Sequence, residues 1–247
     1  MFYRRLNIKA VILAAGKGVR MESELPKVLH SLLGKPLILH VIDNLKDSGI
    51  NDLIVVVGYK GEMVIKAIGD SVEYCWQKEQ LGTGHAVMQT KDILKNYSGS
   101  ILVACGDVPL IQSASFAQLQ DESNKEGIRA VVLTMIQQNP AGYGRIVTCN
   151  DNKIERIVEE KDATPKEKKI KEVNTGTYVF DKDLLFSGLK TIKTDNAQGE
   201  YYLPDVLDYI RSKGYSIGRV LLENCLEGSG INSKEDLARL EGFLQRK

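Results

Sequence analysis

Short runs of consecutive apolar residues that end near a glycine alternate with helical patterns through the first half of the sequence. The runs are residues 10–14, 53–57 and 100–104, closed by Gly16, Gly58 and Gly106. Continuous apolar runs of this length are typical of strands buried on both faces of a parallel sheet. Between them the patterns indicate helices at 36–45, 64–68 and 84–94 and a short strand at 72–76. This alternation predicts βαβ units, and therefore an α/β fold with a mostly parallel central sheet and helices on both faces.

The pattern changes after about residue 127. The next segments have strand character with little helix between them, at 129–136, 144–148, 153–158 and 173–180. They predict a smaller, more antiparallel lobe beside the first half. The end of the chain returns to α/β character, with a helix at 202–213, a strand at 216–222 and a helix at 234–245. Ser233 stands at the N-cap position of that last helix, with Asp236 three residues later.

Length and charge narrow the class of protein. A chain of 247 residues suits one large α/β domain, or one with a modest second lobe. The net charge of +1 provides no general attraction to nucleic acid or to an anionic membrane, so neither is expected as a partner. No apolar run approaches the roughly 20 residues that span a bilayer, and the one near the N-terminus is too short for a signal peptide. We expect a cytoplasmic protein.

Cysteine and histidine spacing argues against a disulfide framework and against zinc. The four cysteines are widely spaced and form no C-x-x-C pair, and the three histidines are equally scattered. Such cysteines are expected to be reduced thiols in the cytosol. A structural zinc site needs four clustered ligands, which this spacing does not favour.

The loop after the first apolar run carries two glycines and is followed by two cations. Residues 13–21 read Leu-Ala-Ala-Gly-Lys-Gly-Val-Arg-Met, and Lys27 follows Pro26. Small residues let the backbone approach a phosphate and present its N–H groups to it. The loop is neither a Walker loop nor a dinucleotide fingerprint, since Gly-Lys-Ser/Thr and the third glycine are missing. Arg20 and Lys27 suit a triphosphate, although a lone Gly-x-Gly would more often be a tight turn between surface cations.

A carboxylate follows the third apolar run. Asp107 comes directly after Gly106, at the carboxyl end of that strand, where open parallel sheets bind ligands. Mg²⁺ prefers oxygen ligands and takes one or two from the protein, together with substrate phosphates. Asp107 is therefore a candidate magnesium ligand, with a simple turn-forming role as the alternative.

Several longer motifs occur in one order along nearly the whole chain. They are residues 13–20 with Pro26-Lys27, 77–85 (Gln-x-x-Gln-Leu-Gly-Thr-Gly-His), Gly106-Asp107, 142–146 (Gly-Tyr-Gly-Arg-Ile), 159–163 (Glu-x-Lys-Asp-Ala), 174–176 (Asn-Thr-Gly) and 196–202 (Asn-Ala-Gln-Gly-Glu-Tyr-Tyr). In these motifs the chain resembles the uridylyltransferase domain of the bacterial bifunctional N-acetylglucosamine-1-phosphate uridylyltransferase/glucosamine-1-phosphate acetyltransferase. The first loop is shared by many sugar-phosphate nucleotidyltransferases, whereas the motifs at 142, 174 and 196 are far more specific.

The resemblance implies a Rossmann-like nucleotidyltransferase fold with a smaller sugar-binding lobe. It implies a nucleotide-binding half at about 8–127, a sugar-binding half at 128–232 and a C-terminal helix at 233–247. It also implies a transfer of UMP from UTP to N-acetylglucosamine-1-phosphate, with Mg²⁺ as cofactor, giving pyrophosphate and UDP-N-acetylglucosamine for cell-wall peptidoglycan. No covalent intermediate or general base is needed, because the attacking phosphate is already ionised.

The family's residue roles carry over by motif. The catalytic residues implied are Arg20, Lys27 and Asp107. The nucleotide-binding residues are Leu13, Ala14, Ala15, Gly16, Lys27, Gln77, Gly82, Thr83 and Gly106, of which Gln77, Gly82 and Thr83 contact the uracil. The sugar-binding residues are Gly144, Glu159 and Asn174, and the Mg²⁺ ligands are Asp107 and Asn232.

The sequence departs from the family pattern at three points. Cys105 replaces the family's usual Tyr before Gly-Asp, and we expect a buried packing thiol there. Residues 227–232 (Glu-Gly-Ser-Gly-Ile-Asn) replace the usual Glu-Gly-Val-Asn, which puts the placement of Asn232 in question. The 247 residues contain no counterpart of the left-handed β-helix that carries acetyl transfer and trimerises the family's enzyme, so we expect a monomer.

Two other functions compete with this interpretation. The first keeps the reaction but uses another sugar-1-phosphate or another nucleoside triphosphate. The second is a non-catalytic nucleotide-sugar-binding regulatory domain. Loss of the phosphate cations or of the metal carboxylate would favour the regulatory domain, yet Arg20, Lys27 and Asp107 are all present.

Overall fold

The computed structural model describes residues 7–149 and 153–245. The described strands are β1 (Ile8–Ala14), β2 (Ser31–Leu32), β3 (Lys35–Pro36), β4 (Leu53–Val57), β5 (Glu73–Trp76), β6 (Ser100–Cys105), β7 (Ile128–Ile136), β8 (Arg145–Thr148), β9 (Ile154–Val158), β10 (Glu172–Asp181) and β11 (Ser216–Leu221). The α-helices are α1 (Leu37–Asp47), α2 (Gly61–Ile68), α3 (Thr83–Met88), α4 (Ser113–Ser123), α5 (Lys182–Leu189), α6 (Val206–Ser212) and α7 (Lys234–Leu244). Single 3₁₀ turns lie at Val19–Met21, Lys27–Leu29, Glu167–Lys169 and Leu203–Asp205.

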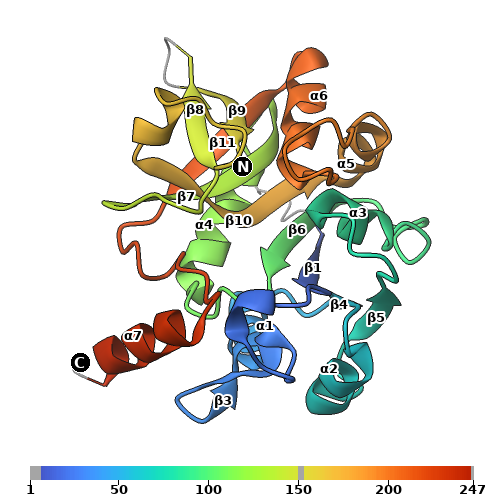
Figure 1. The fold of residues 1–247 in the computed structure, drawn as a ribbon. Helices are drawn as coiled ribbons and strands as arrows, with labels where there is room; N and C mark the ends of the chain where they lie inside the picture. Colours follow the sequence, from blue (N-terminus) through green and yellow to red (C-terminus); the bar gives the residue numbers. More distant parts are fainter. Residues whose placement is uncertain (1–6, 150–152, 246–247) are drawn as a thin grey trace.

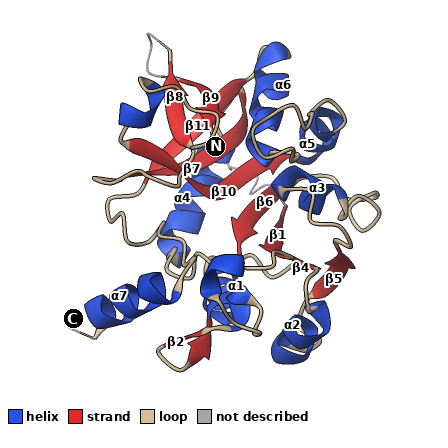
Figure 2. Ribbon diagram, viewed as in Figure 1, coloured by secondary structure: helices blue, strands red, loops and turns tan. Residues whose placement is uncertain are grey.

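One large sheet organises these elements, in the order β11-β7-β10-β6-β1-β4-β5 (Figures 1 and 2). The strands β6, β1, β4 and β5 are parallel to one another, which confirms the predicted parallel sheet. The strand β10 runs antiparallel to both β6 and β7. The antiparallel strands of the second half therefore extend the same sheet. Only β8 and β9 branch from it, through a single β8 pairing with β10.

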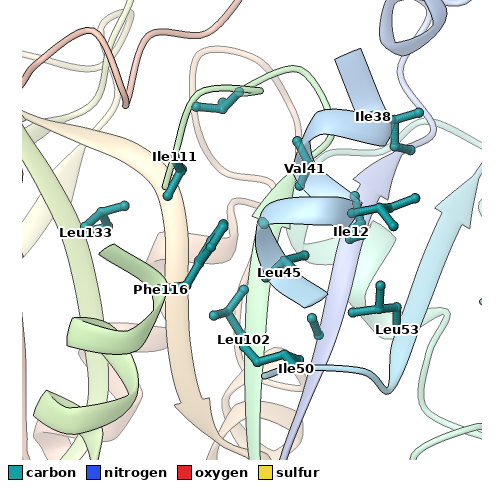
Figure 3. Close-up of a cluster of buried hydrophobic side chains, with 14 of the residues drawn as sticks. Ile12, Ile38, Val41, Leu45, Ile50, Leu53, Leu102, Ile111, Phe116 and Leu133 are labelled. Atoms are coloured by element: carbon teal, nitrogen blue, oxygen red, sulfur yellow. The ribbon is translucent and has the colours of Figure 1, made fainter. Parts of the chain in front are cut away.

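Helices cover both faces of the sheet because alternate residues of each buried strand point to opposite sides. Ile12, Val55 and Leu102 pack in one core cluster with residues of α1, α2 and α4. Figure 3 shows part of that cluster, where Phe116 of α4 and Val41 and Leu45 of α1 lie against the strands. Val11 and Val103 belong to a second cluster with residues of α3, α5 and α6. The result is a three-layer α/β/α architecture, as the alternating pattern predicted.

The C-terminal helix α7 packs in a small cluster of its own. Leu240 of α7 belongs to this cluster together with Leu32, Leu37 and Ile231. The Ser233 side chain accepts from the Asp236 backbone N–H, and the Asp236 side chain accepts from the Ser233 backbone N–H, so the predicted cap is a complete capping box. Residues 246 and 247 of the predicted C-terminal segment lie outside the described residues.

Several helices differ from the sequence predictions. The helix expected at 202–213 begins at Val206, after a 3₁₀ turn, and the one expected at 64–68 begins at Gly61. The helix expected at 84–94 ends at Met88, because a series of i→i+3 turns follows and the Thr90 hydroxyl donates back to the Val87 carbonyl (2.7 Å). The helices α4 and α5 were not predicted. Asp181 is the signal that was missed for α5, since its side chain accepts from the backbone N–H groups of Asp183 and Leu184.

No helix within residues 7–149 and 153–245 has both the length and the apolar character needed to cross a membrane.

Candidate active site

The glycine loop leaves β1 and turns back onto Lys27. Gly18 has φ +60°, and a Cβ atom added there would lie 2.6 Å from the Lys27 Cβ atom. Only a glycine allows this close approach in a left-handed conformation. Gly16 is exposed, with no heavy atom within 4 Å of the position that its Cβ would take. The loop therefore has one glycine that packs Lys27 and one that leaves its backbone open to a ligand.

Cations of the glycine loop meet oxygen atoms from two distant segments. The Lys27 Nζ atom pairs with the Asp107 carboxylate and also donates to Asn232 Oδ1 (3.1 Å). Arg20 donates to the same Asn232 oxygen (2.8 Å). The Ile231 backbone N–H donates to the Asp107 carbonyl (2.9 Å), which holds the 230–232 segment beside β6. The glycine loop and Asp107 thus face one cleft, and the six-residue variant of the Asn232 motif still brings Asn232 into it.

The oxygen atoms of Asp107 and Asn232 fit a hard divalent cation. Both oxygens contact the Lys27 ammonium group, so a single positive charge can reach the two side chains at once. In the described part of the chain there is no cluster of three or more His, Cys, Asp or Glu side chains able to bind a metal ion. Mg²⁺ does not require such a cluster, since it takes one or two protein oxygens and completes its shell with water and substrate phosphates.

A cavity of about 400 Å³, the glycine-loop cavity, lies over the carboxyl ends of β1, β5 and β6. Its lining includes Asp107, the predicted magnesium ligand. It also includes most of the residues predicted to bind the nucleotide: Leu13, Ala14, Ala15, Gly16, Lys27, Gln77, Gly82 and Thr83. Gly106 is the exception. It is buried below the loop, where its backbone N–H donates to the Leu13 carbonyl (2.9 Å) and joins β6 to β1.

The turn that closes this cavity is built around Gly82. Its φ is +104°, and a Cβ atom there would lie 2.7 Å from the Tyr201 carbonyl oxygen. The Gly84 backbone N–H donates to that carbonyl (2.8 Å), and the Tyr201 N–H donates to Leu81 (2.8 Å). The Thr83 hydroxyl accepts from the Leu203 N–H (3.1 Å). The position of residues 81–84 therefore depends on the segment 196–203, which is more than a hundred residues away in the sequence.

A second cavity of about 300 Å³, the β10 cavity, contains the residues predicted to bind the sugar. Gly144, Glu159 and Asn174 line it, and it shares Leu13, Thr83, Cys105 and Asp107 with the glycine-loop cavity. The two cavities are therefore one continuous cleft with Asp107 at their junction. Asn174 is buried, with its amide group donating to the Tyr178 hydroxyl (2.6 Å) and its carbonyl oxygen accepting from the Gly176 N–H (3.0 Å).

Glu159 is a carboxyl group with an unusual proton affinity. Its removal from water, together with the nearby Asp205 and Asp162 carboxylates, raises the pKa of Glu159 from 4.5 to about 7. Arg145 opposes this shift but does not cancel it. Gly144 leaves room for the carboxylate, since a Cβ atom there would lie 3.1 Å from Glu159 Oε1. The β10 cavity therefore contains a poorly solvated acceptor, which is suited to sugar hydroxyl groups.

Two features of the cleft were not predicted. Asp162 accepts from the Ala197 N–H (2.8 Å) and the Tyr202 hydroxyl (3.1 Å), so it ties the Glu159 loop to the segment that supports Gly82. Cys105 is half-buried and lines both cavities, whereas a buried thiol was expected. Desolvation of the thiol group by the surrounding protein, followed by the nearby Asp107 carboxylate, raises the pKa of Cys105 to about 12. The side chain therefore stays a protonated thiol.

A buried arginine holds the Gly142–Gly144 loop in place. Arg145 is 1% exposed, and its guanidinium donates to the Tyr143 carbonyl and pairs with the Glu160 carboxylate. The Gly142 backbone N–H also donates to Glu160 (3.3 Å). A buried charge needs its partner, because its desolvation is otherwise uncompensated. Glu160 is thus a structural neighbour of the cleft.

Glu160→Gln is expected to lower the free energy of unfolding by about 2–3 kcal/mol, because it removes the charge that compensates the buried Arg145 guanidinium. Glu122→Gln is the matched control, since it removes the partner of Lys125, a lysine whose side chain is 64% exposed, and should change stability by about 0.5 kcal/mol or less. Urea denaturation of both variants measures the difference. Equal stabilities would show that Arg145 does not depend on Glu160.

Comparison with known proteins defines the class. Residues 9–224 match the family described as nucleotidyl transferase, and the chain belongs to that family. The fold agrees with a solved structure titled as a putative glucose-1-phosphate thymidylyltransferase from Bacillus anthracis in complex with a sucrose. The two share a TM-score of 0.74 and 22% sequence identity, over 97% of this chain and 96% of that one.

Curated relatives are more similar in sequence. The bifunctional protein GlmU of Oceanobacillus iheyensis is 46% identical over 241 residues, which are 98% of this chain and 53% of that protein. GlmU of Exiguobacterium sibiricum is also 46% identical, over 242 residues, 98% of this chain and 54% of that protein. The chain spans about half the length of the curated relatives it matches. These relatives confirm the predicted resemblance to a bifunctional bacterial protein.

Proposed function

We propose that the protein transfers UMP from UTP to N-acetylglucosamine-1-phosphate, releasing pyrophosphate. The observation that supports this proposal most strongly is the continuous cleft, in which Asp107 lies between the glycine-loop cavity and the β10 cavity. The first cavity has cations and an open glycine backbone suited to a triphosphate, and the second has polar groups suited to a sugar. The similarity to GlmU proteins over 98% of this chain supports the choice of substrates.

The reaction is an in-line displacement at the α-phosphorus of UTP. A phosphate oxygen of the sugar-1-phosphate forms the new P–O bond, and the bond to the β-phosphate oxygen breaks, so pyrophosphate leaves with that electron pair. Two anions must approach each other, so the enzyme contributes positioning and neutralisation of charge. Arg20 and Lys27 are cations that line the cleft, and we assign them to the phosphates. No proton has to leave the attacking group.

Asp107 and Asn232 are the proposed Mg²⁺ ligands. When bound, Mg²⁺ neutralises charge on the phosphate oxygens. The protein's own part is to hold both side-chain oxygens close together, and the Ile231–Asp107 backbone bond does this by joining the two segments.

Gln77 is the proposed reader of the base. Its side chain is buried at the carboxyl end of β5 and lines the glycine-loop cavity. Its amide nitrogen donates to the Gly82 carbonyl (3.0 Å), which leaves the side-chain oxygen to accept from a ligand. Uracil joined to ribose has one N–H donor, at N3, so the acceptor of Gln77 is complementary to that group.

Activity across a matrix of substrates tests this function. Pyrophosphate release is measured for UTP, CTP, dTTP and ATP, each with the 1-phosphates of N-acetylglucosamine, glucose and glucosamine. We expect the highest kcat/KM for UTP with N-acetylglucosamine-1-phosphate. A higher value for another pair would instead establish a different sugar-1-phosphate or nucleotide. Absence of release with every pair, under conditions where UTP still binds, would establish a binding domain without catalysis.

A further inference from the structure

The side-chain amide of Gln77 is held on both of its N–H bonds. Its Nε2 atom lies 3.0 Å from the Gly82 carbonyl oxygen and 3.1 Å from His85 Nδ1. A carbonyl oxygen can only accept, so the nitrogen end of the amide must face Gly82. The same NH₂ group has one further hydrogen, and His85 Nδ1 is placed to accept it. Both donors of Gln77 are then used within the protein.

His85 is itself fixed in position. It lies in the first turn of α3, whose start is anchored by the Gly84–Tyr201 backbone bond (2.8 Å). The Tyr201 ring lies beside it, with ring centroids 6.3 Å apart. Because Nδ1 accepts from Gln77, the proton of the neutral ring is on Nε2. The histidine ring is therefore a positioned acceptor that points at the amide, while the Gln77 oxygen remains for the cavity.

We propose that His85 is a positioning residue that sets the base specificity of the cleft by accepting the second N–H of Gln77. The proposal rests on the function proposed above, with Gln77 as the reader of a pyrimidine. With both N–H groups engaged, Gln77 offers a nucleotide only an acceptor, which favours the N3–H of uracil and repels the N3 lone pair of cytosine. Without His85, only the Gly82 bond opposes rotation of the amide, so the amide can turn over and present its N–H groups to cytosine N3.

A matched pair of variants separates the acceptor from the shape of the side chain. Leu and Asn have nearly the same size, but Asn can present a side-chain oxygen to the Gln77 amide and Leu cannot. We expect His85→Leu to lower the UTP-to-CTP ratio of kcat/KM by about tenfold, the value of one hydrogen bond of typical strength. His85→Asn should keep the ratio within about threefold of the unmodified protein, because it restores the acceptor.

The readout is the UTP-to-CTP ratio of kcat/KM. A general loss of packing lowers the activity with both nucleotides and leaves this ratio unchanged. Thermal melting and far-UV circular dichroism verify that both variants are folded, and His85→Ala replaces His85→Leu if the latter is not. N3-methyl-UTP adds a test that needs no variant, since it lacks the N3–H group. The unmodified protein should use it at least tenfold less well than UTP, and His85→Leu should discriminate less.

The outcomes distinguish this proposal from the proposed function. If the unmodified protein does not prefer UTP to CTP, the uracil-reading function of this cleft is wrong. If it prefers UTP and folded His85→Leu keeps the full ratio, the proposed function stands and the role of His85 is overturned. If both variants lose the ratio equally, the ring acts through packing rather than as an acceptor, and the proposal is again overturned.

Discussion

Replacing Asp107 by Asn should lower kcat for pyrophosphate release about 100- to 1,000-fold, the effect of losing one preorganised charge contact. The physical reason is that Asp107 provides the carboxylate that pairs with Lys27, at the junction of both cavities. We expect the variant to remain folded, because Asn keeps an acceptor for Lys27 and Lys27 keeps Asn232 (3.1 Å). Initial rates at saturating UTP and sugar phosphate measure the effect.

Asp43→Asn is the control for Asp107→Asn. It removes the carboxylate of another lysine pair, with Lys35, on the exposed side of α1. Its activity should match that of the unmodified protein, which would show that losing a lysine–carboxylate pair is not in itself harmful. A magnesium titration adds a second readout, since Asp107→Asn should need more Mg²⁺ for half-maximal rate. Near-normal turnover of a folded Asp107→Asn protein would rule out the metal role.

Replacing Glu159 by Gln should weaken sugar use and stabilise the fold. The carboxylate accepts hydrogen bonds from sugar hydroxyls in our proposal, and bonds to a charged group contribute about 1.5–3 kcal/mol. We therefore expect the KM for N-acetylglucosamine-1-phosphate to rise about 10- to 100-fold, while the KM for UTP changes about twofold or less. Initial-rate kinetics with each substrate varied in turn measures both constants. An equal rise in both would contradict the assignment of Glu159 to the sugar.

The stability effect of Glu159→Gln should depend on pH. The pKa of Glu159 is about 7 in the folded protein against 4.5 as the ordinary value, so the folded state binds its proton more tightly. The stability that the protonated Glu159 side chain contributes is therefore fully present below about pH 4.5. It is lost as the pH rises through about 7. Gln cannot ionise, so the variant should gain roughly 2–3 kcal/mol at pH 8 and almost nothing at pH 4.5.

Thermal or urea unfolding at pH 4.5 and pH 8 measures this difference, with Glu126→Gln as control. Glu126 is exposed in the loop after α4, so the control should show no such pH dependence. Ionisation of Glu159 should also make the KM for N-acetylglucosamine-1-phosphate fall as the pH rises from 6 to 8, because the carboxylate is the form that accepts from the sugar. The substrate phosphate also titrates near pH 6, but it is common to both proteins, so the Glu159→Gln variant corrects for it. A stability gain that is equal at both pH values would show that folding does not raise the pKa of Glu159.

Much of the fold was predictable because local patterns carry it. Continuous apolar runs identify β1, β4 and β6, since a strand covered on both faces has no polar alternation. The cap of α7 was also visible, because Ser233 and Asp236 are three residues apart and need no distant partner. The helix α5 was missed although its cap is equally local, since Asp181 also ends β10 and the strand pattern dominated.

The candidate site was only partly predictable. The glycine loop, Asp107 and Gln77 stand at the ends of recognisable strands, and parallel strands place such ends at one edge of a sheet. The groups around them come from elsewhere in the chain. Asp162 supports the turn at Gly82 through segment 196–203, and Cys105 lines both cavities because β10 pairs with β6. Neither relation is visible in a local pattern.

The amino-acid sequence by itself determined the period and burial of the main strands and helices, the two glycines of the loop and the chemical types at the strand ends. Only the tertiary structure decided that β10 enters the sheet between β6 and β7, and that Asn232 meets Lys27 and Asp107. Local patterns are set by which face of a segment avoids water, and that is a property of neighbouring residues. The pairing of strands and the meeting of side chains 80 or 205 positions apart depend on how all segments pack at once.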